Sequence, residues 1–144
     1  TDFFRTAYVS GLREETESNI RTAASLNSPN DREGFYVKLI AIGLVSYLYD
    51  MAWAYIYRSQ IELLLELNKG KLLPLAEAKK YYDNAAAAYP TLYANYPFDR
   101  WLEFLKSHTM ILQYPGDIID LTHRGKDFLK YLTHNGRYAE QKKY

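Results

Sequence analysis

One stretch of the chain is apolar on all sides of a helix. Residues 35–57 read FYVKLIAIGLVSYLYDMAWAYIY, and Lys38 and Asp50 are the only charged residues among them. A helix without a polar face is buried on every side, either in a protein core or in a bilayer. This segment would be roughly 33 Å long as a helix, against a hydrocarbon core of roughly 30 Å. The pattern predicts a hydrophobic helix over residues 34–58, which we expect to be a single membrane span.

Aromatic and basic residues stand at both ends of the segment, as they do at the boundaries of membrane spans. Basic residues are slightly more frequent after the segment than before it, which favours a cytoplasmic C-terminal side. The candidate membrane-boundary residues are Phe35, Tyr36 and Lys38 at one end and Tyr55, Tyr57 and Arg58 at the other.

Asp50 lies inside the apolar segment, about two turns from its C-terminal end. A carboxylate in a bilayer is unfavourable by a few kcal/mol unless it is paired, neutral or facing protein. We therefore expect Asp50, together with Trp53, to contact a partner helix. The alternative is that residues 35–57 form the buried helix of a soluble, dimeric protein.

The preceding residues, 1–33, are mostly polar. Phe4, Tyr8 and Leu12 recur every four residues and predict one helix face, and a second short helix is predicted from Glu14 to Leu26. This segment is either an ordinary packing helix or an amphipathic segment lying on a membrane or partner surface. Acidic residues interrupt it, so we expect no secretory signal and a nearly complete chain.

Amphipathic helices follow the apolar segment. Residues 58–68 and 74–89 are predicted helices, the first ended by Asn68-Lys69-Gly70 and the second by Tyr89-Pro90. A third helix starts at Pro97. Its apolar stripe at helical spacing consists of Phe98, Trp101, Leu102 and Leu105.

The period then changes to that of strands. Met110–Tyr114 and Asp117–Thr122 predict a hairpin around the turn dipeptide Pro115-Gly116. A last helix begins near Thr122, whose hydroxyl can cap it, and ends at His134-Asn135-Gly136. Residues 137–144 are expected to form a polar, mobile tail.

The order of three helices, a two-stranded wing and a helix over residues 59–136 resembles a winged-helix domain. Within it, the run IDLTHRGKDFL over residues 119–129 looks like the segment that follows the wing in MarR-like regulators. That resemblance implies that Leu121 fills the core beneath the wing, that Thr122 caps the helix and that Gly125 allows close packing.

The whole pattern is similar to that of small, largely uncharacterised bacterial membrane proteins with a C-terminal winged-helix-like domain. This resemblance covers residues 35–138 and implies a bacterial inner-membrane protein, with its C-terminal domain in the cytoplasm. The expected fold is mostly α. It has an N-terminal helical segment (1–33), one hydrophobic helix (34–58), a winged-helix-like domain with a two-stranded wing (59–136) and a polar tail (137–144).

The balance of charged residues argues against nucleic-acid binding. The chain has 18 Lys and Arg against 17 Asp and Glu, so no charge excess is available to neutralise phosphates. The third helix, which reads DNA in winged-helix regulators, carries two acids and two bases (Asp99, Glu103, Arg100, Lys106). The wing tip carries no Arg or Lys. Nucleic acid is therefore not the expected partner.

The sequence lacks the patterns of an active site. It has no cysteine, no Gly-rich phosphate loop and no nucleophile elbow. His108, His123 and His134 are not at metal-ligand spacing. We predict no catalytic residue, no cofactor and no metal, and hence no enzyme.

Tyrosine is unusually frequent, with 15 residues. Those between the second and third helices form either an amphipathic packing layer or an interface rich in aromatic anchors, and the crowding favours the interface. The candidate partner-interface residues are Asp50, Trp53, Tyr81, Tyr82, Tyr89, Tyr93, Tyr96 and Trp101.

These features predict a non-catalytic, membrane-anchored accessory or assembly subunit. It would dock on a larger, membrane-embedded protein complex through its hydrophobic helix and its Tyr-rich winged-helix-like module, and it would contact the lipid bilayer. The alternative is a soluble, dimeric MarR-like DNA-binding transcription regulator.

Overall fold

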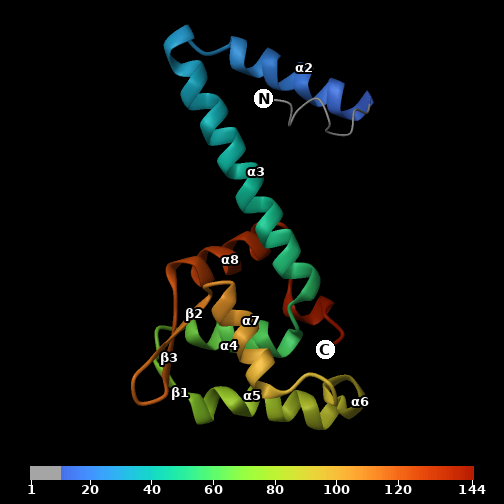
Figure 1. The fold of residues 1–144 in the computed structure, drawn as a ribbon, viewed down its shortest axis with the longest axis vertical. Helices are drawn as coiled ribbons and strands as arrows, with labels where there is room; N and C mark the ends of the chain where they lie inside the picture. Colours follow the sequence, from blue (N-terminus) through green and yellow to red (C-terminus); the bar gives the residue numbers. More distant parts are fainter. Residues whose placement is uncertain (1–10) are drawn as a thin grey trace. The chain divides into compact units, whose positions relative to one another are not determined.

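The computed structural model describes residues 11–144, with side chains from Glu14 onward except at residue 29. The chain divides into two compact units, Thr1–Tyr47 and Leu48–Tyr144. Most of the described chain is helical, and a small antiparallel sheet lies in the second unit (Figure 1). The expected mostly helical fold class is thus confirmed. The helix predicted around Phe4, Tyr8 and Leu12 falls outside the described residues.

The first unit contains the helix α2, Gly11–Ser25, and the short 3₁₀ turn η1, Pro29–Asp31. The predicted helix from Glu14 to Leu26 corresponds to α2. Ser28 precedes η1, and its hydroxyl donates to the Asp31 carboxylate. The long helix α3, Arg32–Tyr55, begins directly afterwards and continues into the second unit.

The helix α3 ends earlier than the predicted range of residues 34–58. Ile56 and Tyr57 separate it from α4, Arg58–Leu67. Tyr57 has extended backbone and caps α4, and its N–H donates to the Gln60 side-chain carbonyl at 2.8 Å. The break is invisible in the sequence because neither Gly nor Pro marks it. It is held by this cap and by the burial of Ile56, which is 1% exposed.

The second unit continues with a mixture of helices and short strands. The prediction missed the short strand β1 and the short helix α6. The elements after α4 are β1 (Leu73–Pro74), α5 (Leu75–Ala88), α6 (Pro90–Tyr93), α7 (Phe98–Ser107), β2 (Ile111–Tyr114), β3 (Ile118–Leu121), α8 (His123–His134) and η2 (Ala139–Gln141).

The predicted hairpin is confirmed as β2 and β3, and β1 adds a third strand on the other side of β3. Gly116, in the hairpin turn, has φ +87°, a conformation that glycine adopts without a steric penalty. The neighbouring Asp117 also has positive φ, and its carboxylate accepts a hydrogen bond from the Gln113 amide at 3.0 Å.

The junction between β3 and α8 has the helix cap, the buried leucine and the close packing that were predicted for it. The Thr122 hydroxyl accepts a hydrogen bond from the Gly125 N–H at 2.9 Å, which caps α8. Leu121 is buried. A Cβ at Gly125 would collide with the Met110 carbonyl oxygen and would lie 2.5 Å from Leu121 Cδ1, so only glycine fits here.

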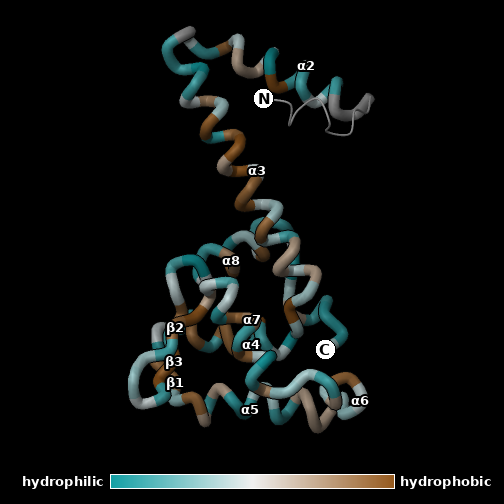
Figure 2. Tube along the Cα trace, viewed as in Figure 1, coloured by the Kyte–Doolittle hydropathy of each residue, from teal (hydrophilic) through white to brown (hydrophobic). Residues whose placement is uncertain are grey.

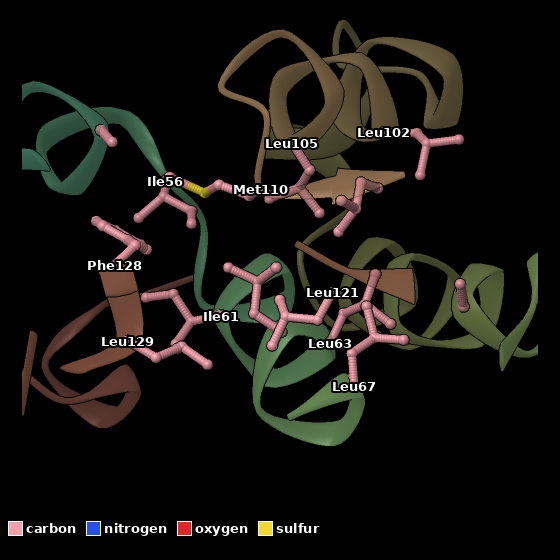
Figure 3. Packing of buried hydrophobic residues seen from close by; sticks show 14 of the residues in the cluster. Ile56, Ile61, Leu63, Leu67, Leu102, Leu105, Met110, Leu121, Phe128 and Leu129 are labelled. Atoms are coloured by element: carbon pink, nitrogen blue, oxygen red, sulfur yellow. The ribbon is translucent and has the colours of Figure 1, made fainter. Parts of the chain in front are cut away.

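The core of the second unit lies between α4, α7, α8 and the sheet, and the end of α3 contributes to it (Figure 3). Trp101 and Phe128 are its largest fully buried side chains. The predicted stripe on the third helix is confirmed for Trp101, Leu102 and Leu105, while Phe98 packs against the core and is partly buried. The labelled core residues in Figure 3 are Ile56, Ile61, Leu63, Leu67, Leu102, Leu105, Met110, Leu121, Phe128 and Leu129.

The C-terminal segment, 137–144, is packed, which corrects the expectation of a mobile tail. It forms η2, and Ala139 is 5% exposed. Its last carbonyl, at Tyr144, accepts a hydrogen bond from the Arg58 N–H at 2.5 Å. The prediction failed because the polar composition of the segment hid the one small apolar residue that enters the core.

Candidate interaction surfaces

The middle of α3 presents exposed apolar side chains. Hydrophobic residues follow one another along this helix (Figure 2). Ile40, Ile42 and Leu44 are 60–65% exposed. By length and composition α3 is the one helix of the described chain that could cross a membrane. An uncovered apolar surface of this kind is typical of a lipid or protein interaction site.

The predicted membrane-boundary residues divide into two groups. Phe35 and Tyr36 lie in the first turns of α3, with ring centroids 5.8 Å apart, and Lys38 follows them on an exposed position. At the other end, Tyr55 is 65% exposed.

Tyr57 and Arg58, by contrast, belong to the packed unit. The ring of Tyr57 lies 4.7 Å from that of Tyr96 and 5.7 Å from that of Tyr144. Arg58 opens α4 and forms an ion pair with Glu62 at 2.8 Å. Both residues lie beyond the end of α3, and their assignment to the membrane boundary stays a prediction.

The last two turns of α3 pack against α8. The Tyr49 hydroxyl donates to the Asp127 carboxylate at 2.9 Å, and its ring makes an edge contact with Phe128 at 5.4 Å. Tyr49 and Ala52 are 5% and 1% exposed. These turns are therefore held by contacts that the preceding turns lack.

Asp50 has its partners within its own chain. Its carboxylate accepts hydrogen bonds from the Tyr131 hydroxyl at 2.8 Å and from the Arg137 guanidinium at 2.6 Å. The structure gives Asp50 an intramolecular ion pair, and the contact with a partner helix stays a prediction. No spacing signal in the sequence links residue 50 to residue 137, so sequence reasoning missed Arg137.

Trp53 lies beneath two cations of the C-terminal segment. The Lys142 ammonium is 4.7 Å from the ring centroid, and the Arg137 guanidinium carbon is 5.7 Å from it. Cations at these distances are attracted by the ring quadrupole. Burial, assisted by the charge of Arg137, lowers the pKa of Lys142.

Several candidate interface residues form a buried polar network instead. The Trp101 indole N–H donates to the Ser59 hydroxyl at 3.0 Å, and Ser59 and the Tyr93 hydroxyl lie 2.8 Å apart. The fully buried Gln60 donates its amide to the Trp101 carbonyl at 2.7 Å. Burial raises the pKa of Tyr93 to about 12.

This network places Trp101 and Tyr93 in a packing layer, the alternative to the predicted interface, while the interface itself stays a prediction. Trp101 is 0% and Tyr93 is 4% exposed, so neither can anchor a partner from the surface. Tyr82 is half-buried and donates to the Tyr96 carbonyl at 2.9 Å, while Tyr96 is half-buried as well. Buried tyrosines find hydrogen-bond partners inside the fold, which satisfies their hydroxyls without a second protein.

Tyr81 and Tyr89 are among the candidates that remain accessible. Tyr81 and Tyr89 line a hollow of about 220 Å³ between α4 and α5, together with Arg58, Glu62 and Tyr144. This volume is below the roughly 300 Å³ at which small-molecule pockets usually begin. The hollow is therefore a surface feature and not a ligand cavity.

The surface of α7 has mixed charge. Glu103 forms an ion pair with Lys106 at 3.7 Å, and Asp99 stands in the first turn of α7. Within the described residues, no group of three or more metal-binding side chains lies together.

Comparisons with known proteins found no match to the chain among family models, curated proteins or solved structures. The surfaces described above are therefore the basis for a functional proposal.

Proposed function

We propose that this protein is a non-catalytic, membrane-anchored accessory subunit. In this proposal α3 enters the bilayer and residues 48–144 form a module at the membrane surface that docks on a larger protein complex. The observation that carries the proposal is the exposure of apolar side chains on α3, where Ile42 is 65% and Leu44 60% exposed. Surface of this kind is unfavourable in water and is stabilised by acyl chains or by a neighbouring transmembrane helix.

The length of the exposed apolar surface of α3 supports a site in the membrane that α3 shares with a partner complex. From Phe35 to Leu48 the helix rises roughly 20 Å, and from Tyr49 onward its side chains contact the polar α8 and the C-terminal segment. A span shorter than the roughly 30 Å hydrocarbon core is accommodated by bilayer thinning or by oligomerisation. A partner complex in the membrane would allow accommodation by oligomerisation.

The module itself supports the winged-helix-like part of the proposal. Its order is α4, β1, α5, α7, β2, β3 and α8, with α6 inserted before α7. The strand between the first two helices pairs with the hairpin in the order β1-β3-β2. Apart from β1 and α6, this order is the one predicted from the resemblance to winged-helix domains, and the Thr122 cap and the close packing at Gly125 support the same proposal.

A soluble, dimeric DNA-binding regulator is the second candidate. It is favoured by the same apolar surface of α3, which a second copy of the chain could cover equally well. Against DNA binding stand the acidic side chains of α7 and of the wing turn, because phosphates would repel Asp99, Glu103 and Asp117.

Membrane extraction separates the two candidates. The full chain should stay in the membrane pellet after a carbonate wash. Ile42→Lys combined with Val45→Lys should release it, because both charges would have to enter the hydrocarbon. The matched control is Leu112→Lys with Tyr114→Lys on β2, where both side chains are also exposed, and this variant should remain in the pellet.

Release of the unmodified chain by carbonate would contradict the membrane proposal. If the released protein is then dimeric without detergent and binds DNA at low salt, the second candidate is correct.

A further inference from the structure

The end of α3 combines exposed apolar side chains with cations. Leu48 and Met51 are 46% and 39% exposed, and Tyr55 is 65% exposed. In the same two turns, the ring of Trp53 is covered by Arg137 and Lys142. An indole ring with adjacent cations next to apolar side chains is the combination that proteins place at a membrane–water interface.

The charges of this cluster are unequally compensated. Arg137 is paired with Asp50 at 2.6 Å. The nearest recorded acceptor of Lys142 is the Ala54 carbonyl at 3.5 Å, and no described Asp or Glu forms an ion pair with its ammonium. Lys143 follows in an exposed position. The Lys142 ammonium therefore stands beside Trp53 without an Asp or Glu partner among the described residues, and Lys143 adds a second positive charge next to it in the chain.

We propose that Trp53, Arg137, Lys142 and Lys143, named here the cationic collar, bind the headgroups of anionic phospholipids where α3 leaves the membrane. A headgroup phosphate would supply a negative partner for the Lys142 ammonium. The ring of Trp53 would lie at the level of the headgroups, and Leu48 and Met51 would contact acyl chains. This inference rests on the proposed membrane anchoring and names the lipid class that the anchor prefers.

Fluorescence quenching by brominated lipids tests the collar. The full chain is reconstituted into phosphatidylcholine vesicles that contain an equal fraction of either brominated phosphatidylglycerol or brominated phosphatidylcholine. The bromines are placed near the headgroup end of one acyl chain. Trp101 is 0% exposed and serves as a constant background, so changes report on Trp53.

Brominated phosphatidylglycerol should quench Trp53 more strongly than the brominated phosphatidylcholine. Each unpaired cation near an anionic surface corresponds to about a fivefold local enrichment of anionic lipid. The variant Lys142→Gln with Lys143→Gln should abolish this preference. The matched control Lys69→Gln with Lys71→Gln removes the same charge from the loop after α4 and should retain it.

The outcomes distinguish the collar from the anchoring on which it rests. Equal quenching of the unmodified chain by the two lipids would overturn the collar but would not contradict the membrane insertion of α3. An acidic protein segment would then be the expected partner of these cations. Quenching by neither lipid would also overturn the collar, because Trp53 would then lie away from the bilayer, whereas the anchoring itself is overturned by release of the unmodified chain in the carbonate wash.

Discussion

The two parts of α3 have similar apolar sequences and opposite surroundings. In residues 36–47 the hydrophobic side chains are largely exposed, with Leu44 at 60%. In residues 48–55, Tyr49 and Ala52 are buried against the rest of the second unit. The apolar composition of α3 thus indicates that its surface has to be covered. Which part of that surface the chain covers itself depends on the contacts of α8 and of the C-terminal segment.

Truncation of a core side chain should give the largest difference between the two regions. Phe128→Ala should lower the free energy of unfolding by about 3–5 kcal/mol, because the ring is fully buried. Ile42→Ala, in the exposed part of α3, should change it by about 0.5 kcal/mol or less. Denaturant unfolding followed by circular dichroism measures both. Similar losses for the two variants would show that α3 is covered within the chain.

Two glycines provide the next comparison. Gly125→Ala should destabilise the protein by about 1–3 kcal/mol, because the added methyl group meets the Met110 carbonyl and the Leu121 side chain. Gly43→Ala has open space around it and should be neutral or stabilising by about 0.5–1 kcal/mol, as alanine favours a helix. Thermal unfolding of both variants under one condition is the measurement. A stabilised Gly125→Ala protein would contradict the close packing at α8.

Alkaline pH should act on the packed unit through Tyr93. Its pKa is about 12 in the folded protein against 10.0 for the free side chain, so the unfolded chain loses this proton first. The stabilising contribution is complete below pH 10 and falls by about 2–3 kcal/mol as the pH rises to 12. Unfolding midpoints over this range should decrease, and Tyr93→Phe should reduce the slope. An unchanged slope in that variant would show that Tyr93 is not the buried group responsible.

The ion pair of Asp50 and Arg137 should have the smallest effect. Their side chains are 50% and 28% exposed, so solvent weakens the attraction and the coupling should be about 0.5 kcal/mol. A double-mutant cycle with Asp50→Asn and Arg137→Gln measures it. A coupling several times larger would mean that a partner or lipid excludes water from this pair.

Local features of the module were predictable because neighbours in sequence create them. The stripe containing Trp101 and Leu105 follows from helical spacing, and the hairpin follows from the strand pattern on both sides of Pro115-Gly116. The Thr122 cap was equally visible, since a capping residue and its helix are adjacent.

The candidate interface was harder to predict because it depends on contacts between distant residues. Asp50 meets Arg137 across 87 positions, and Ser59 meets Tyr93 across 34. Nothing in the local pattern distinguishes a tyrosine that enters such a network, such as Tyr93, from one that stays accessible, such as Tyr89.

Periodicity and turn chemistry in the sequence are sufficient to predict a mostly helical chain, an apolar helix over residues 35–57 that is long enough to cross a membrane, and a two-stranded hairpin. The contacts between distant segments show that α3 stops at Tyr55, that β1 joins the sheet, that Tyr93 enters a buried network while Tyr89 stays exposed and that the C-terminal segment packs over Trp53. The physical reason is that these features arise from side chains far apart in sequence, whose shared burial and hydrogen bonds exist only once the fold has formed.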